Sequence, residues 1–484
     1  MLKFTEAASV FLKGFRRNKV SLTGMIIISV TFPLLIACAF LDVLEVVHDP
    51  LFGAWVYGVL TPLFILGHCI FFTGFFLIGS GPDRESPCSY SYIKNHFPHV
   101  SEKTNFRILI FLASSLAVGN FVVVVLVGYT GHHYSETTRF CGTLCHFSMS
   151  PESGAHEISP HSRVACVDCH VGSGLKNFVS SKIAGMRQVV STATGSYPRP
   201  IRMPTHGLRP AKQTCEECLR PELFHGDKLK IIDRYQEDEK NTHLQTALLM
   251  KVGSGGQGTG ARGIHWHVSS KNKIMYTYED EFRERISEVH LFKADGSEII
   301  FKNPEVTTED HSGSPHHGSK EMDCVDCHNR PAHIYYCPEE ALDRRISNGM
   351  ISTELPFIKK KGMELITTAY PSKEQALQAI ATALPAWYAK QYPETAREKG
   401  NYIIQAVASL QEAYRENIYP DMKIDWNTYP SNLGHHDEGG CFRCHNDTLE
   451  AADGSIIPQD CETCHFLLAE DESNPEIISI LLGE

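Results

Sequence analysis

Three long apolar runs dominate the first 130 residues of the chain. They lie at about Leu22–Leu44, Leu51–Gly79 and Ile108–Tyr129, and each is long enough to cross the hydrocarbon core of a bilayer as a helix. The residues before the first run carry a cluster of Lys and Arg side chains, and such a flank stays on the cytoplasmic side. The pattern predicts a membrane anchor of three transmembrane helices in residues 1–130, with everything after Tyr129 outside the cytoplasmic membrane.

The first apolar run also has a second interpretation, as a cleaved signal peptide. A basic flank and an apolar centre are typical of such peptides, and "LIAC" at Leu35–Cys38 resembles a lipoprotein cleavage site. The run continues past Cys38, which favours a retained span. Both interpretations leave the long C-terminal part outside the membrane.

The chain after residue 130 contains no further run that is long enough to span a membrane. Residues 131–230 are rich in Gly, Pro, Ser and His, which predicts loops and short helices. Residues 231–320 read as an insertion. Within it, Val289–Lys302 has two β-rich arms around Asp295-Gly296, a pattern that predicts a β-hairpin.

The last predicted region, residues 321–484, contains a helical segment at 338–420. Ser372–Gln375 reads "SKEQ", a capping box that predicts the start of a helix. Pro385 and Pro393 are expected to divide the helices, because proline removes a backbone donor and clashes with the preceding turn.

A repeated cysteine motif indicates the chemistry of the exported part. Chance would give roughly 0.03 copies of C-x-x-C-H in a chain with 16 Cys and 25 His among 484 residues. Two thiols at this spacing can bond to the vinyl groups of a haem, and the adjoining histidine then ligates the iron. A zinc site or a disulfide ladder does not explain why histidine directly follows the second cysteine each time. The motif occurs at Cys166–His170, Cys324–His328, Cys441–His445 and Cys461–His465, and Cys141–His146 has one extra residue between its cysteines.

These motifs predict five c-type haems, and a related stretch predicts a sixth. The proximal iron ligands are His146, His170, His328, His445 and His465. The haem-attaching cysteines, with the sixth pair included, are Cys141, Cys145, Cys166, Cys169, Cys215, Cys218, Cys324, Cys327, Cys441, Cys444, Cys461 and Cys464. The fold class that follows is a membrane-anchored multihaem cytochrome c, with N-terminal transmembrane helices. Its exported domain is expected to be mainly α-helical and irregular, wrapped around haems, with a small β-hairpin insertion.

This related stretch reads "CEECLRPELFHGDK" and carries Leu219 where the other motifs have histidine. Two interpretations stay open. The cysteines hold a haem whose iron takes a substitute ligand, for which His225 is the nearest histidine along the chain. Alternatively the haem is lost, and a dithiol or a disulfide remains.

Electron-transfer haems with six-coordinate iron also need distal ligands. The candidates beside the motifs are His161, His333 and one of His435 and His436. "HWH" at His265–His267 is a further candidate, because alternate residues on a strand would point the same way.

Several stretches resemble the NapC/NirT/NrfH family of membrane-anchored multihaem quinol dehydrogenases. These are "CGTLCHFSM", "SPHSRVACVDCHVGSG", "KIAGMRQVVSTATGSYPRPI" and "TCEECLRPELFHGDK", within residues 107–230. The later "GIHWHVSSKNKIMY", "MDCVDCHNRPAH" and "GGCFRCHN", together with the two additional spans, resemble the extended inner-membrane ImcH-like group. Residues 131–230 would then be the NapC/NirT-like haem domain, and 321–484 a C-terminal haem domain.

The resemblance implies that menaquinol is oxidised at the outer face of the cytoplasmic (inner) membrane. In the family, a Met after the first motif ligates its iron, so that either Met149 or His146 is the ligand here. Lys182 lies near the position of a Lys that borders the family's quinol pocket. Gln188 stands where NrfH-like members carry an acidic residue, and an amide cannot serve as the proton acceptor there.

The partners implied are the membrane quinone pool and periplasmic cytochromes or reductases as acceptors, with no nucleic acid. A net charge of −11 suits either docking of a basic protein or simple solubility. The alternative function is a terminal reductase of a small oxyanion at a haem with an open iron position. The chain lacks the C-x-x-C-K motif typical of nitrite reductases, which favours an electron relay.

Overall fold

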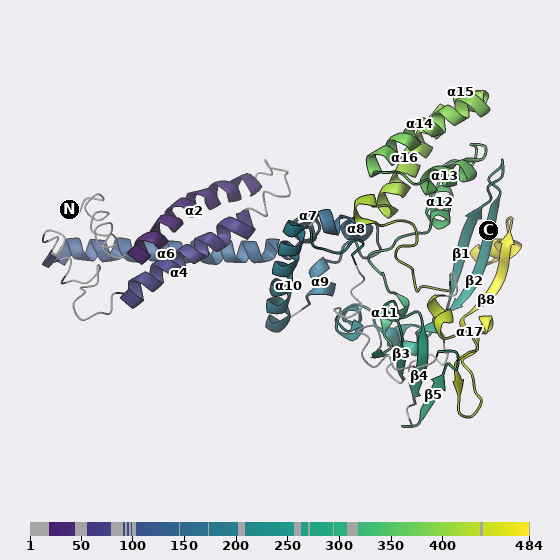
Figure 1. The fold of residues 1–484 in the computed structure, drawn as a ribbon, viewed down its shortest axis with the longest axis horizontal. Coiled ribbons are helices and arrows are strands. Elements are labelled where there is room, and N and C mark those ends of the chain that lie inside the picture. The colour runs from purple at the N-terminus through teal and green to yellow at the C-terminus, as the bar shows by residue number, and fades with distance from the viewer. Residues whose placement is uncertain are drawn as a thin grey trace. The chain divides into compact units, whose positions relative to one another are not determined.

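The computed structural model divides the chain into two compact units, Met1–Phe147 and Ser148–Glu484. Figure 1 shows the ribbon. The structure describes residues 19–43, 56–78, 91, 94–95, 98, 103–144, 146–172, 174–201, 209–255, 263–269, 272–293, 295–306, 318–435 and 439–483. Cys145, His436 and the side chain of His146, three of the predicted haem-site positions, lie outside this description.

The described part of the N-terminal unit is helical. Helices α2 and α4 approach closely, since a Cβ added at Gly24 would lie 2.4 Å from the backbone nitrogen of Phe71. Phe64 is fully buried between them and packs beside Leu35. The elements are α2 (Lys19–Val43), the π-helical turn η1 (Val56–Leu60), α4 (Thr61–Ile78), α6 (Lys103–Tyr134) and α7 (Thr138–Leu144).

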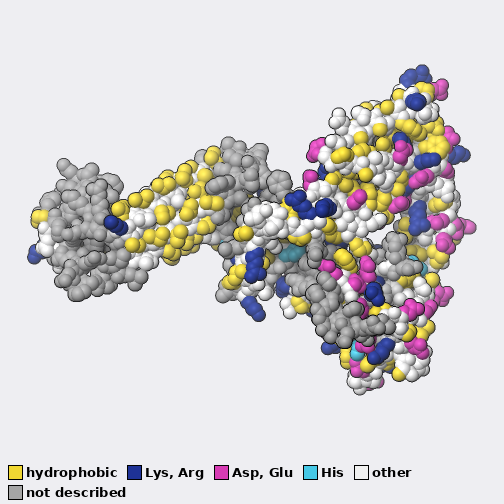
Figure 2. Space-filling model, viewed as in Figure 1, with side chains coloured by type: hydrophobic (Ala, Val, Ile, Leu, Met, Phe, Trp, Pro, Cys, Tyr) yellow, Lys and Arg dark blue, Asp and Glu magenta, His cyan; other side chains and the backbone are white. Residues whose placement is uncertain are grey.

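Two of these helices, α2 and α6, are long and apolar enough to cross a membrane, and the apolar part of α4, Thr61–Gly74, is shorter. Figure 2 shows hydrophobic side chains covering the described surface of this unit. On α6 the large side chains of Phe111 and Phe121 are exposed to the extent of 71% and 68%, and further apolar side chains along the helix, among them Val118 and Leu126, are also exposed. A continuous apolar surface of this kind is rare on a water-soluble protein. The N-terminal apolar helix indicates a membrane anchor.

Three helices mark the start of the C-terminal unit, and the second of them is the motif at Cys166–His170. They are followed by short 3₁₀ turns and then by strands (Figure 1). The helices are α8 (His146–Glu157), α9 (Cys166–His170) and α10 (Leu175–Thr194), and the turns are η2 (Ala211–Gln213), η3 (Cys215–Glu217) and η4 (Pro221–Leu223).

Two antiparallel sheets follow, and both are completed by strands from the end of the chain. The first has the order β1-β2-β8, in which β1 (Asp227–Tyr235) and β8 (His465–Glu472) flank β2 (His243–Lys251). The second has the order β6-β3-β4-β5-β7. Its strands are β3 (Lys273–Tyr278), β4 (Ile286–Phe292), β5 (Glu298–Lys302), β6 (Gly318–Glu321) and β7 (Glu450–Ala451).

The hairpin predicted around Asp295-Gly296 is confirmed, because β4 and β5 pair in register from Phe292↔Glu298 to Glu288↔Lys302. The expectation of a mainly α-helical and irregular domain with one small hairpin is wrong. The unit is mixed α/β, and the polypeptide of residues 227–321 shares its sheets with residues 450–472. Strands this far apart in the sequence pair without leaving a local sequence pattern, so the sequence alone could not predict these two sheets.

The helical segment holds the largest hydrophobic core. Leu342, Ile366, Ile380, Leu384 and Leu410 are fully buried in it. Its helices are α12 (Pro338–Ser347), α13 (Ile358–Thr367), α14 (Lys373–Gln391), α15 (Pro393–Glu398) and α16 (Gly400–Asn417). The remaining elements are η6 (Pro420–Met422), η8 (Gly440–Arg443), α11 (Cys324–Cys327), α17 (Cys461–Cys464) and α18 (Glu476–Leu482).

The predicted start of α14 is confirmed, because the Ser372 side chain accepts a hydrogen bond from the backbone N–H of Gln375. The predicted division at Pro385 is wrong, and α14 runs through it. Leu384 and Tyr388 are fully buried on either side, so that core packing compensates for the lost backbone bond. Pro393 does divide the helices, at the first turn of α15.

Candidate haem sites

The cysteine motifs form single helical turns. In the motifs that begin at Cys324, Cys441 and Cys461, the backbone N–H after the second cysteine donates to the carbonyl of the first, at 2.8 Å for His328 to Cys324 and 3.0 Å for His445 to Cys441. One helical turn puts both thiols on one side and the following side chain next to them. Leu219 makes the same bond to Cys215, at 2.8 Å. The motif without histidine therefore keeps the backbone shape of the others.

Four motif histidines each lie close to a second histidine from elsewhere in the chain. The ring centroids are 6.2 Å apart for His170 and His333, and 6.5 Å for His328 and His265. They are 5.8 Å apart for His445 and His267, and 6.3 Å for His465 and His435. The sequence candidates His265, His333 and His435 thus each gain a motif partner, and so does His267 of the "HWH" stretch.

The predicted strand at "HWH" is wrong. Ile264–Val268 is a 3₁₀ turn, η5. A Cβ added at Gly263 would lie 2.2 Å from the carbonyl oxygen of Lys251, so the chain before the turn lies directly against the end of β2. Glycine permits this approach, and the turn that follows presents His265 and His267 to two different motifs.

Hydrogen bonds determine which ring nitrogen remains available. A carbonyl can only accept, so a ring Nδ1 beside one must carry the proton and leave the Nε2 lone pair free for a metal. The Nδ1 atoms of His265, His267, His333 and His445 donate to the carbonyls of Val252, Ile264, Glu152 and Pro458, at 2.7, 2.8, 3.0 and 2.9 Å. Such bonds fix the orientation of a metal-ligating imidazole.

Other histidines have their Nε2 engaged. That atom of His243 bonds to Asp233 at 2.7 Å, and that of His156 bonds to the Val164 carbonyl at 3.1 Å. Both nitrogens of His290 face carboxylates. These side chains are structural in this arrangement.

The remaining sequence candidates have no motif histidine as a ring partner among the described residues. His161 Nδ1 donates to the Pro331 carbonyl at 3.0 Å, and His225 Nδ1 donates to the carbonyl of Leu223 at 2.7 Å on an exposed turn. The role of His225 as a substitute ligand stays a prediction.

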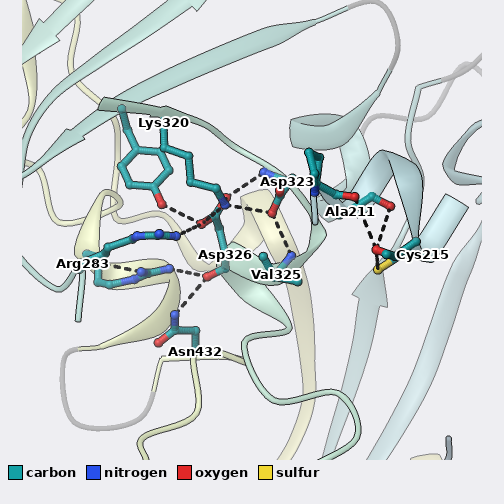
Figure 3. Close-up of polar contacts among 12 residues, drawn as sticks. Ala211, Cys215, Arg283, Lys320, Asp323, Val325, Asp326 and Asn432 are labelled. Atoms are coloured by element: carbon teal, nitrogen blue, oxygen red, sulfur yellow. Dashed lines mark hydrogen bonds and ion pairs between the residues drawn. The ribbon is translucent and has the colours of Figure 1, made fainter. Parts of the chain in front are cut away.

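Along the chain, Cys141–His146 is the first motif and the stretch at Cys215–Leu219 is the third. The fourth motif, Cys324–His328, has a buried polar centre, which Figure 3 shows in close-up. The Asp326 carboxylate, whose side chain is 2% exposed, accepts from the hydroxyl of Tyr276 at 2.6 Å and from Lys320 Nζ at 2.8 Å. It also accepts from the backbone N–H of Asp323 at 2.7 Å and from Arg283 at 3.5 Å. Burial raises the pKa of Tyr276, so its hydroxyl remains the donor.

The backbone of the same residue connects two motifs. The Asp326 carbonyl accepts from Arg443 Nη2 at 2.6 Å and from Asn432 Nδ2 at 3.1 Å. Arg443 lies between the cysteines of the fifth motif, so this bond holds the fourth and fifth motifs together. Sequence reasoning missed Asp326, because the second and fourth motifs have the same sequence, "CVDCH". Only the structure shows that Asp326 is buried whereas the equivalent Asp168 is exposed.

The third motif lies beside the fourth. The Cys215 thiol is within hydrogen-bonding reach of Cys324, which lowers the pKa of Cys215, and the Thr214 hydroxyl lies 3.7 Å from the Cys215 Sγ. Burial raises the pKa of Cys327 and Cys444. Four cysteines from three motifs thus line one region of the unit.

The residues fit haem c. The motif turns, the free Nε2 atoms and the paired histidines are the donor set that covalently attached haem requires. Nε and Nη1 of Arg209 are buried without a hydrogen-bond partner among the described residues. They lie against Gly172, just after the second motif, where a Cβ would meet the guanidinium at 1.5 Å. A buried guanidinium calls for an anion, and a haem propionate supplies one.

The candidate quinol residues lie on two helices of the same unit. Met149 is half-buried on α8, Lys182 is half-buried on α10, and Gln188 is exposed on α10. Val179, Ile183 and Val190 form an exposed apolar row along α10, because their spacing places them on one helix face.

Comparison with known proteins identifies the family. Residues 102–220 match the model of the NapC/NirT cytochrome c family, N-terminal region. The chain is also 36% identical to the cytochrome c-type protein ImcH of Geobacter sulfurreducens, over 95% of this chain and 90% of that protein. The chain belongs to the NapC/NirT cytochrome c family. No solved structure matches it.

As a NapC/NirT cytochrome, the chain is a membrane c-type cytochrome of electron transport that carries several haems c. The family resemblance expected from "CGTLCHFSM" and the following stretches is confirmed, as is the ImcH-like likeness of the whole chain. The family implies the quinone pool and redox proteins as partners.

Proposed function

We propose that this NapC/NirT cytochrome oxidises menaquinol at the outer face of the cytoplasmic membrane and delivers the electrons to periplasmic redox proteins. In this proposal residues 1–130 form a three-span anchor, and the domain after Tyr129 is periplasmic. It carries six haems c, five at the C-x-x-C-H-type motifs and one at Cys215 and Cys218. Haem c supplies reversible one-electron transfer when it is bound.

The observation that carries the proposal is the set of motif turns with paired histidines in a chain of this family. Four irons that each took both histidines of such a pair would have no open position for a substrate, which suits electron transfer rather than reduction of a small molecule. The turn retained at Cys215–Leu219 supports haem attachment at Cys215 and Cys218 as well.

The quinol site is proposed on α8 and α10. The exposed row of Val179, Ile183 and Val190 is suited to the apolar boundary of a bilayer, where a lipid-soluble quinol presents its ring. Lys182 Nζ would donate a hydrogen bond to a quinol oxygen and orient it. The Gln188 amide can donate or accept a hydrogen bond but cannot take a proton, so proton release needs water or another base.

Oxidation of menaquinol releases two electrons and two protons, and Met149 or His146 would complete the first iron site. The test compares Lys182→Ala with Lys176→Ala, an exposed lysine on the same helix. Anaerobic stopped-flow mixing with a reduced menaquinol analogue is followed at the haem α-band. We expect reduction to slow at least about tenfold in Lys182→Ala, the effect of losing one charge-assisted hydrogen bond of about 1.5–3 kcal/mol.

Lys176→Ala and reduction by dithionite are expected to be unchanged. Equal slowing in both lysine variants would mean that charge on α10 matters only for surface attraction. Unchanged rates in both variants would exclude Lys182 from the quinol site. Quinol oxidation itself is tested separately, by whether the menaquinol analogue reduces the haems of the wild-type protein.

A further inference from the structure

The four histidine pairs have the separation that a shared iron imposes. Bonds of about 2.0 Å from iron to each imidazole nitrogen, plus about 1.2 Å from nitrogen to ring centre, place two opposed ring centres roughly 6.4 Å apart. The observed separations run from 5.8 to 6.5 Å. His333 also lies 6.3 Å from His156, but His156 Nε2 is engaged by the Val164 carbonyl, so that His170 is the partner with a free Nε2.

We infer that His333, His265, His267 and His435 are the distal ligands of the second, fourth, fifth and sixth motifs, and that these sites form one unbranched succession in that order. Both the distal ligands and the order of the sites go beyond the proposed function, because they hold whether or not menaquinol is the electron donor. The inference rests on short backbone segments that each carry ligands of two neighbouring sites.

The first connection joins the second and fourth motifs. His328, the proximal ligand of the fourth site, and His333, the distal ligand of the second, lie in one short stretch after Cys327. Arg330 in this stretch bonds to the Glu152 carboxylate at 3.0 Å, and His333 donates to the Glu152 carbonyl. The stretch is therefore held against α8.

The second connection joins the fourth and fifth motifs through η5. His265 faces His328, and His267 faces His445, with only Trp266 between them in sequence. The bond from Arg443 to the Asp326 carbonyl holds the same two motifs together independently. Two separate contacts thus make these sites neighbours.

The third connection joins the fifth and sixth motifs. His435 precedes the fifth motif and faces His465 of the sixth. A Cβ added at Gly440, where φ is +60°, would lie 2.0 Å from the Gly434 carbonyl oxygen, so the backbone just before Cys441 lies directly against the backbone just before His435. His445 donates in turn to the carbonyl of Pro458, just before the sixth motif.

The succession ends at the sixth motif, where Cys461 is exposed and β8 begins. The third motif stands beside the succession, next to Cys324, and is not a member of it. Sequence order would place the third motif between the second and fourth, so the proposed connectivity differs from the order of motifs along the chain.

The test uses the full protein in detergent and two neighbouring variants, His265→Met and His267→Met. Replacing one histidine ligand with methionine creates a haem with mixed ligands, which has a higher reduction potential and its own charge-transfer band and low-spin EPR signal. Each single variant is expected to show one such haem. To assign it, each variant is combined with His328→Met or His445→Met.

The pairs predict opposite results. His265→Met with His328→Met changes both ligands of one iron, so the mixed-ligand signal is lost and one doubly substituted haem replaces it. His265→Met with His445→Met changes two irons, so two mixed-ligand haems appear. His267→Met must give the reverse pattern.

Two mixed-ligand haems in every combination would overturn the pairing, and so would an unchanged spectrum in the single variants.

If a double variant does not fold, the single variants treated with imidazole provide a second measurement. In His265→Gly and His267→Gly, added imidazole is expected to restore one low-spin haem each, at different potentials. Restoration at the same potential would show that the two histidines serve one iron, contrary to the inference.

Discussion

The Asp326→Asn substitution tests how the fourth motif is held in place. The Asp326 carboxylate accepts bonds from the side chains of Tyr276 and Lys320 and from the backbone of Asp323, and it is nearly inaccessible to water. An amide keeps one accepting oxygen and turns an N–H₂ group toward donors. The change therefore breaks bonds and leaves positive charge without its counter-charge in a buried place.

Removing one partner of a buried ion pair costs about 3–5 kcal/mol. Lys320 keeps a second carboxylate, that of Asp323, at 3.0 Å, so the lower end of that range applies. At about 2–4 °C per kcal/mol for a unit of a few hundred residues, a loss of about 3 kcal/mol lowers the midpoint of thermal unfolding by roughly 6–12 °C. Circular dichroism at the helix band measures this midpoint.

The second motif supplies a matched control. Asp168 occupies the same place in an identical "CVDCH" and is exposed, where it accepts a single bond from the Ala165 backbone at 3.2 Å. Asparagine can accept that bond equally well, so Asp168→Asn should change stability by less than about 0.5 kcal/mol. Similar midpoints for the two variants would refute the argument that burial of Asp326 distinguishes the two motifs.

Three further results are expected. Lys359→Met should cost about 3 kcal/mol in a thermal melt, because Lys359 Nζ bonds to the buried Asp343 carboxylate at 2.5 Å, whereas exposed Lys360→Met should have almost no effect; equal effects would contradict this. Intact-mass analysis should find six covalent haems in the wild type, and a mass corresponding to five would eliminate the haem at Cys215. The Cys215→Ala, Cys218→Ala double variant should lose one haem and keep the others, and loss of further haems would mean that these cysteines serve folding as well.

The sequence was sufficient for features that depend on neighbouring residues. The motif turns, the hairpin at Asp295-Gly296 and the cap at Ser372 each follow from local chemistry, and the structure contains all three. The pairing of β7 and β8 with distant strands could not be predicted, because no local pattern records which strand becomes a neighbour. Pro385 was misleading because the buried core around Leu384 outweighs the loss of one backbone bond.

The candidate sites divide in the same way. The proximal histidines are defined by spacing, whereas the histidines opposite them come from segments up to about 180 residues away, such as His267 and His445. "HWH" was recognised as a candidate for the wrong reason. Its alternate histidines were expected on one face of a strand, and the close approach of Gly263 to Lys251 produces a 3₁₀ turn that serves two motifs.

The most direct test of the proposed function is anaerobic mixing of the oxidised wild-type protein in detergent with a reduced menaquinol analogue, followed at the haem α-band. The account predicts rapid reduction that a quinone-site inhibitor blocks. No reduction by the quinol analogue, in a sample that dithionite reduces fully, would contradict it and would mean that another redox protein supplies the electrons.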